Sequence, residues 1–159
     1  MPLSLSSPSF ENEAGIPVRH TCEGDEASPE LRWSDAPPGT KAFALIVDDP
    51  DAPDPAAPQR VFTHWVLYDM PPGTARLPEG VSIKDLPDGT RQGLNDRAGI
   101  GWCGPCPPIG RHRYFHKLYA LDAKLGDLGR PDRKAVELAM EGHVLERAQL
   151  MGTYQKRGN

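Results

Sequence analysis

Residues able to do chemistry gather around three apolar segments of this sequence. Asp49 follows the first segment, His64 lies inside the second, and His112 comes just before the third. If the three segments are neighbouring strands of one sheet, two imidazoles and a carboxylate converge on one spot. A buried imidazole has two ring nitrogens that need partners, so each histidine could also be a hydrogen-bonded structural residue. Three such groups beside loops shaped by proline favour a site.

Two rival chemistries suit these residue types. In a thiol hydrolase, Cys106 would be the nucleophile and His112 or His64 the base. Asp49 would orient that base, but no oxyanion site can be placed from the sequence. In a metal site, the aspartate and the two histidines would form a set of two imidazoles and one carboxylate.

A third chemistry is suggested by the pentapeptide Trp102–Cys106, which spells the active-site sequence of thioredoxins. Cys103 and Cys106 would then act as a thiol–disulfide oxidoreductase. In such a site the first thiol sits at a helix N-terminus, where the helix dipole lowers its pKa. Here Pro107 and Pro108 follow at once, and no helix can begin cleanly on Cys106. The prolines weaken the redox interpretation.

Three core strands are predicted to position these residues. The continuous apolar run Ala42–Val47 is typical of a buried central strand. Val61–Tyr68 is rich in β-branched and aromatic residues, which favour strands, and Arg113–Leu121 is predicted to be the third core strand. The chain also holds 18 prolines and 16 glycines, which leave little room for helix. The sequence therefore predicts a mostly β protein.

The remaining segments are predicted to be loops, with one exception. Asp51–Pro58 and Pro78–Gly101 are expected to be mainly loop, since they are rich in proline, glycine and polar residues. From Pro131 to about Leu150 the apolar residues share one helical face. Gly142 is expected to break this stretch into two short helices.

Composition bounds the function. A chain of 159 residues fits a single domain, taken as 1–159. The net charge is −4, with no basic tract, which argues against a nucleic-acid partner. No apolar stretch is long enough to span a membrane, and Met1–Ser4 lacks the start of a signal peptide, so a cytoplasmic location is expected.

Three cysteines are too few for a disulfide framework. The absence of phosphate-loop and dinucleotide motifs predicts no nucleotide cofactor.

Several motifs, taken together, resemble the phosphatidylethanolamine-binding protein family, in its bacterial and archaeal branch that is often described as Raf kinase inhibitor-like. Each motif is weak alone, but their order and spacing are specific, and the similarity runs from about Pro17 to Tyr154. The principal motifs are Asp48–Pro53, Thr63–Trp65, Gly104–Pro108, Gly110 and His112–Tyr114. Supporting motifs are Thr21–Gly24, Ser28–Pro29 with Leu31 and Trp33, Gly142–His143 and Gly152–Tyr154.

The resemblance implies a β-sandwich with short peripheral and C-terminal helices and a small anion pocket at one end. Asp49 is expected either to orient a histidine, which would aim its other N–H into the pocket, or to contact the ammonium of a zwitterionic headgroup. Backbone amides of the glycine-bearing loop would complete a nest for phosphate or carboxylate. Asp51 and Arg113 would be either an ion pair beneath the pocket or solvated charges. The ligand-binding residues implied in this way are Asp49, His64, Trp102, Gly104, Cys106, Pro107, His112 and Tyr114.

Cys103 departs from the family pattern, whereas Cys22 and Cys106 match it. Cys103 could be a small side chain in a loop, could form a disulfide with Cys106, or could make the pocket rim redox-sensitive. A reducing cytoplasm favours the first of these interpretations.

The function predicted overall is binding rather than catalysis. The expected ligand is a small anionic or phosphorylated group, such as a phospholipid headgroup, with no cofactor and no bound metal. Regulation of kinase signalling or of a hydrolase, and a homodimeric state, are further expectations from the resemblance. The cysteine hydrolase and the thiol–disulfide oxidoreductase are the alternatives.

Overall fold

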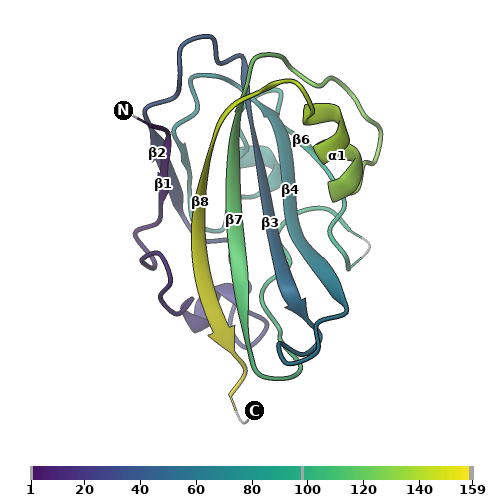
Figure 1. The fold of residues 1–159 in the computed structure, drawn as a ribbon. Coiled ribbons are helices and arrows are strands. Elements are labelled where there is room, and N and C mark those ends of the chain that lie inside the picture. Colours follow the sequence, from purple (N-terminus) through teal and green to yellow (C-terminus); the bar gives the residue numbers. More distant parts are fainter. Residues whose placement is uncertain (1, 98, 158–159) are drawn as a thin grey trace.

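The chain folds into two antiparallel β-sheets packed face to face, with one α-helix on the outside (Figure 1). The structure, a computed structural model, describes residues 2–97 and 99–157, apart from the side chain of Ile83. The larger sheet has five strands in the order β6-β4-β3-β7-β8, and the smaller has three in the order β1-β2-β5. The prediction of a mostly β sandwich is confirmed.

The larger sheet contains the three predicted core strands at its centre. Its strands are β3 (Ala42–Ala52), β4 (Arg60–Met70), β6 (Arg91–Gln92), β7 (Arg111–Leu121) and β8 (Val144–Gln155). In β3 every side chain from Ala42 to Asp49 is buried, because both faces of this central strand are covered. The strand continues through Ala52, so the predicted loop begins only at Pro53, two residues later than expected. Side chains near Asp49 are therefore held by sheet pairing.

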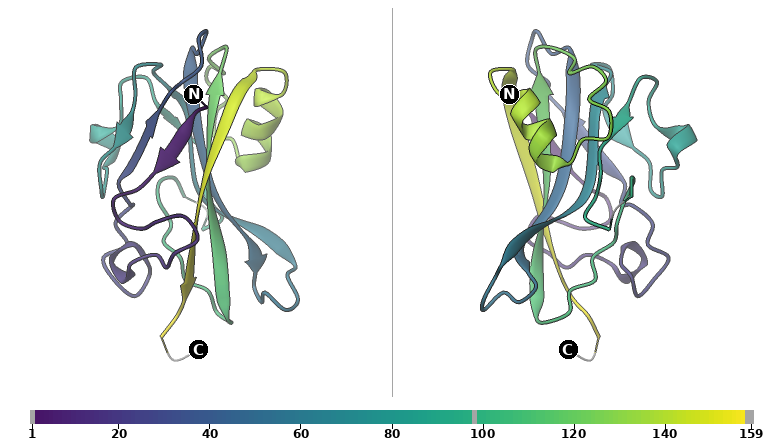
Figure 2. Two further views of the ribbon diagram at one scale, coloured as in Figure 1. Left: turned by 60° about the vertical axis from the view of Figure 1, so that its left-hand side comes forward. Right: turned by 90° about the vertical axis from the view of Figure 1, so that its right-hand side faces the viewer.

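The smaller sheet covers one face of the larger one and closes the main core. Its strands are β1 (Ser4–Ser6), β2 (Leu31–Ser34) and β5 (Arg76–Leu77). Leu31 and Trp33 point from β2 toward Phe43 and Leu45 of β3, and all four side chains are buried in one apolar cluster. Two 3-10 turns, Val18–His20 and Ile83–Asp85, lie in the connecting loops. In Figure 2 the two strands β1 and β2 and the helix lie on opposite sides of the long strands.

The helix α1 (Arg133–Met140) covers part of the outer face of the larger sheet. It begins after Asp132, whose side chain accepts a hydrogen bond from the backbone N–H of Ala135. Val136 and Met140 pack on Ile46 of β3 in a second, smaller apolar cluster. No helix among residues 2–97 and 99–157 is long and apolar enough to cross a membrane.

The second predicted C-terminal helix is wrong, because residues from Val144 onward form the strand β8. Gly142 does end the helical stretch, with a φ of +81° that favours glycine. Beyond it the chain pairs with β7 from Leu121↔Val144 to Arg111↔Gln155. Pairing with the whole length of β7 outweighs the helical periodicity of the segment. His143, expected inside a helix, instead lies just before β8 and pairs with Asp122.

Candidate functional site

A pocket of about 360 Å³ lies where the C-terminal end of β3 meets the N-terminal ends of β4 and β7. Its two sides differ in origin. The strand wall consists of Asp49, Phe62, His64, His112 and Tyr114. The loop wall consists of Arg97, Cys106, Pro107 and Pro108. Ala52, Pro53, Arg60 and Asp96 complete the lining.

Asp49 and His112 form a buried pair at the base of the strand wall. The imidazole Nδ1 of His112 lies 2.5 Å from a carboxylate oxygen of Asp49, and the other carboxylate oxygen accepts from the backbone N–H of Asp51. Burial raises the pKa of Asp49, although the bond from His112 works against this shift. The imidazole Nε2 of His112 faces the backbone oxygens of Ile109 and Pro53, at 2.9 and 3.1 Å.

The contacts of His112 correct one expectation from the sequence. Asp49 does orient this histidine, as predicted. The second ring nitrogen, however, faces two backbone carbonyls and does not offer a free N–H to the pocket. Because a carbonyl can only accept, this Nε2 must carry a hydrogen that is already used.

His64 lies deeper in the strand wall and is almost fully buried. Its Nδ1 is 2.6 Å from the backbone oxygen of Cys103, and the N–H of Cys103 donates to the backbone oxygen of His64 at 2.9 Å. Its Nε2 has no hydrogen-bond partner among the described residues. Burial lowers the pKa of His64 to about 4, so the ring is neutral at neutral pH.

Tyr114 stands beside His64, with the two ring centroids 5.1 Å apart in an edge-on arrangement. The phenol oxygen of Tyr114 is buried and has no hydrogen-bond partner among the described residues. Burial, and next the charge of Asp49, raises the pKa of Tyr114, so the hydroxyl keeps its proton. An unpaired buried polar atom costs about 1–3 kcal/mol, which makes these two side chains candidates for ligand contact.

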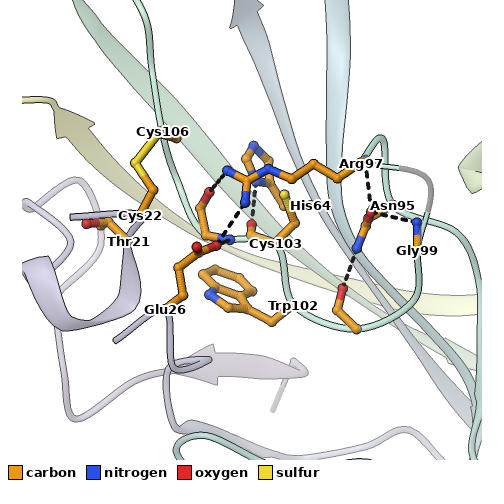
Figure 3. Close-up of polar contacts among 12 residues, drawn as sticks. Thr21, Cys22, Glu26, His64, Asn95, Arg97, Gly99, Trp102, Cys103 and Cys106 are labelled. Atoms are coloured by element: carbon orange, nitrogen blue, oxygen red, sulfur yellow. Dashed lines mark hydrogen bonds and ion pairs between the residues drawn. A yellow bond between two sulfur atoms is a disulfide. The ribbon is translucent and has the colours of Figure 1, made fainter. Parts of the chain in front are cut away.

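Besides its hydrogen bonds to His64 of β4, the segment that carries the loop wall is fastened to an N-terminal loop (Figure 3). Cys106 forms a disulfide with Cys22, 84 residues away in the sequence, and the N–H of Cys22 donates to the backbone oxygen of Pro105. Glu26 accepts from the N–H of Gly104 at 2.9 Å. A β-carbon at Gly104 would lie 2.7 Å from a backbone oxygen, so the close approach needs glycine.

Two arginines bring positive charge to the pocket. Arg97 donates to the carboxylate of Glu26 at 3.0 Å and to the backbone oxygen of Gly104 at 3.4 Å. Figure 3 shows this side chain extending across the loop wall, between Glu26 and Asn95. The guanidinium of Arg60 lies over the ring of Phe62, 5.1 Å from its centroid. Arg60 is exposed and keeps its charge free of any ion pair among the described residues.

The family model described as phosphatidylethanolamine-binding protein matches residues 6–155 of this chain. The chain belongs to the phosphatidylethanolamine-binding protein family. It is 45% identical over 155 residues to a UPF0098 protein of Methanothermobacter thermautotrophicus, covering 97% of this chain and 99% of that one.

Two solved structures of this family share the fold over the whole chain. A putative homologue from Chlamydia trachomatis is 39% identical, covers 98% of both chains and gives a TM-score of 0.88. YbcL of E. coli, described as a new member of the mammalian family, is 29% identical and gives a TM-score of 0.88. The match covers 99% of this chain and 100% of that chain.

The cysteines differ from expectation in this family member. The Cys103–Cys106 bond that was one of the alternatives is wrong, because Cys106 pairs with Cys22 in the one disulfide among the described residues. Cys103 remains a free thiol, buried beside His64, and burial raises its pKa to about 11. Neither sulfur is therefore available as a thiolate in this structure, which argues against a hydrolase with Cys106 as nucleophile and an oxidoreductase that uses Cys103 with Cys106. Because disulfides are typical of oxidising compartments, this bond also removes one support for the cytoplasmic prediction.

Two residues predicted for the site lie outside the pocket lining. Trp102 packs against the main core and donates its indole N–H to the backbone oxygen of His20. Gly104 is close by, but its N–H is used by Glu26, so it cannot join an anion nest. Both residues hold the loop wall in place. The other six predicted residues line the pocket.

Sequence reasoning missed several lining residues, notably Arg60 and Arg97. Arg60 follows a proline-rich loop and Arg97 lies beside Asn95 and Asp96, so a surface role is the ordinary interpretation of both, and no spacing signal separates them from other arginines. Of the two alternatives for Asp51 and Arg113, the ion pair is present, with two contacts of 2.8 and 3.0 Å, and the guanidinium lowers the pKa of Asp51. Within the described ranges, no group of three or more histidine, cysteine, aspartate or glutamate side chains is placed to hold a metal ion.

Proposed function

We propose that this protein binds small phosphate-bearing or other anionic groups in the pocket between its strand and loop walls, without catalysing a reaction. The observation that carries this proposal is the pair of unpartnered polar atoms at the strand wall, Nε2 of His64 and the hydroxyl of Tyr114. A ligand that reaches both atoms would relieve the cost of leaving them unpaired. Membership of the phosphatidylethanolamine-binding family supports a binding role.

The size and lining of the pocket favour a headgroup over a larger molecule. A volume of about 360 Å³ is near the lower end of the range for small-molecule sites. Phe62, Pro107 and Pro108 supply apolar walls that exclude water around a few polar groups. The free guanidinium of Arg60 adds positive charge at this site. A phospholipid headgroup and a free phosphorylated compound share this chemistry, and both are sources of such a ligand.

The absence of catalysis is part of the proposal and is supported by the state of the nucleophiles. Cys106 is held in a disulfide, and the buried thiol of Cys103 has a pKa raised to about 11. His112 has both nitrogens engaged, so it cannot act as a free base. Regulation of a kinase or a hydrolase, and dimer formation, stay predictions from the family resemblance.

The proposal can be tested by NMR titration with inorganic phosphate and with phosphoethanolamine. We expect saturable shifts at His64 and Tyr114, with much smaller shifts at the exposed His143. Tyr114→Phe should weaken binding about tenfold, since a hydrogen bond to a charged group contributes about 1.5 kcal/mol or more. His143→Gln is the matched control. Shifts that stay linear with concentration and ignore Tyr114→Phe would contradict the proposal.

The two sources of the ligand can be separated with the same protein. Vesicles of phosphatidylethanolamine should compete with phosphoethanolamine if the headgroup of a lipid can enter the pocket. If only the soluble compound competes, free phosphorylated molecules are the ligand class. Phosphatidylcholine vesicles serve as the control, because their larger headgroup tests the size limit of the pocket.

A further inference from the structure

Two neighbouring strands of the larger sheet separate where the pocket lies. Pairing between β3 and β7 ends at Asp48↔Phe115. Both strands continue beyond this point, to Ala52 in β3 and to Arg111 in β7, yet no further backbone pairing joins them along the residues described. Figure 2 shows the ends of β3 and β4 diverging from β7 in both views. The pocket is lined from both sides of this gap.

We call the separated part of β3 and β4, residues 49–62, the hairpin arm. Inside the arm the two strands stay paired with each other, at Asp49↔Phe62 and Ala52↔Arg60. The register of β3 against β4 shifts twice near the base of the arm, and such irregularities bend a strand. All four of these paired residues line the pocket. The arm is therefore one continuous piece of the pocket wall, and it carries the free guanidinium of Arg60.

Side chains take the place of backbone pairing between the arm and β7. At the base of the arm, Asp49 contacts His112 next to the last paired residues. Further along, Asp51 accepts from the backbone N–H of Arg113 at 2.9 Å and from two nitrogens of its guanidinium at 3.0 and 2.8 Å. Nε2 of His112 also lies 3.1 Å from the backbone oxygen of Pro53. The two-pronged contact of Asp51 is the strongest type of hydrogen bond among these.

The loop wall on the other side of the pocket is held more firmly than the arm. Its segment carries the Cys22–Cys106 disulfide, and the backbone N–H of Cys103 donates to His64 of β4. The arm contains no cysteine, and its residues 56–60 are exposed. Of the two walls, the arm is the one that can move from its neighbour without breaking a covalent link or strand pairing.

The closed pocket leaves its polar side chains little room to contact a ligand. Asp49, His64, His112 and Tyr114 are all buried, although each lines the pocket. Nε2 of His64 and the hydroxyl of Tyr114 are covered by other atoms of the protein. A ligand that contacts such groups needs a wall that moves aside and then returns.

We propose that the hairpin arm moves away from β7 to admit the ligand and then closes over it, and that Asp51 and Arg113 form the latch that holds the arm closed. Asp49 and His112, at the base of the arm, stay in contact and act as the pivot. Neither residue of the latch lines the pocket, so both are positioning residues that act on binding through the arm. The inference rests on the proposed function, because it describes how that ligand enters and leaves.

The test measures the association and dissociation rates of phosphoethanolamine with Arg113→Gln, by NMR line-shape analysis. The variant loses the two-pronged contact, so the open arm is more populated in both the free and the bound protein. We therefore expect both rates to rise about tenfold, while the affinity, which is their ratio, changes little. Arg113→Lys keeps the charge without the two-pronged contact, so its rates should lie in between. Rates equal to those of the unaltered protein would overturn the inference.

Lys117→Gln is the matched control for the latch. The ammonium of Lys117 lies 3.0 Å from a carboxylate oxygen of Asp48, so this ion pair joins the same two strands. It lies where β3 and β7 are still paired through their backbones. Losing it should lower the stability and leave both ligand rates unchanged. If Lys117→Gln speeds ligand exchange as much as Arg113→Gln does, the rates report a general loosening of the protein, and the latch is wrong.

Hydrogen exchange measures the opening of the arm without a ligand. The N–H of Arg113, which donates to Asp51, should exchange faster than the amides of the paired segment 42–48. Asp51→Asn keeps an oxygen that accepts from this N–H but removes the charge, so exchange in the arm should speed up several-fold. Combined with Arg113→Gln it should add little, because both changes act on one contact. An arm protected as well as segment 42–48 would contradict the inference.

Failure of this inference is distinguishable from failure of the proposed function. If neither inorganic phosphate nor phosphoethanolamine binds the unaltered protein or any variant, the proposed function fails, and the admission of ligand by the arm fails with it. If they bind at rates that do not depend on the latch, the anion pocket stands and only the moving arm is wrong.

Discussion

The two walls of the pocket are built in different ways. The strand wall is fixed by sheet register, with Asp49 opposite Phe62 and His112 opposite Tyr154 in adjacent strands. The residues of the loop wall lie outside the strands. Their segment is tied to the N-terminal loop by the Cys22–Cys106 disulfide and by the hydrogen bond from Gly104 to Glu26. The strand wall therefore carries the polar groups that need accurate placement, while the loop wall gives the pocket its shape and can vary separately.

The largest expected effect comes from acid, which acts on His64 in the strand wall and on His116, a buried residue of β7 outside the pocket lining. Burial lowers the pKa of both His64 and His116 to about 4, from 6.5 in the unfolded chain. Because the unfolded state binds more protons between these values, stability is fully present above about pH 6.5 and is lost as the pH falls through 4. Each ring contributes about 3 kcal/mol when the loss is complete. Urea unfolding from pH 7 to pH 4 measures this directly.

Controls for the acid effect lie in the same chain. Asp49 acts in the opposite direction, because its raised pKa stabilises the folded state at low pH and that contribution is lost as the pH rises. His116→Gln should remove about half of the histidine effect, since the ring is fully buried. His143→Gln, an exposed ring, should leave it unchanged. A pH profile that is flat between 7 and 4 would contradict the buried, neutral state of the two histidines.

The strand wall was predictable from sequence, whereas the fastening of the loop wall was not. A continuous apolar run locates β3 and a segment with three aromatic residues locates β7, and the polar residues at their ends follow from the chain order. The bond between Cys22 and Cys106 joins positions 84 residues apart, and no local spacing signals such a pairing. Glu26 likewise contacts Gly104 across 78 residues. These contacts arise only once the two sheets have brought the loops together.

The strand β8 is a second feature that the local sequence does not predict. The apolar residues near Val144 fit a helical period, and the local sequence alone favours helix over strand. Pairing along β7 decides the outcome. Without β8, the outer edge of β7 would have unpaired backbone N–H and C=O groups. The helix ends at Met140 and the strand begins at Val144, with Gly142 making the turn.

The next largest effect is expected from breaking the loop wall. The double variant Cys22→Ser/Cys106→Ser opens a loop closed across 84 residues and should lower the free energy of unfolding by about 2–4 kcal/mol. Phosphate affinity should fall several-fold, because Cys106 no longer holds the prolines of the wall in place. Hydrogen exchange in β3 and β7 should change little. Denaturant unfolding, phosphate titration and exchange on one sample measure the three quantities.

The matched comparison for this variant is the unaltered protein in the presence of a strong thiol reductant. Both should show the same lower stability, since each lacks the covalent link. Cys103 stays buried and reduced in both cases, so its thiol cannot account for a difference. Equal stability of the oxidised and reduced protein would mean that the hydrogen bonds of this segment, such as those from Cys22 to Pro105 and from Gly104 to Glu26, are enough to hold the loop wall.

The smallest effect is expected from a substitution at Glu26, which tests whether the loop wall contributes to phosphate affinity through its charge or through its shape. Glu26→Gln keeps an oxygen to accept from the N–H of Gly104 but removes the negative charge beside Arg97. Stability should fall by only about 1 kcal/mol, because the ion pair is partly exposed. The charge of Arg97 is then no longer neutralised, so affinity for phosphate should rise about two- to fivefold at low salt and return to normal at high salt. If affinity falls at every salt concentration, Glu26 serves the pocket by holding the loop wall in shape, and the charge of Arg97 has no part in binding.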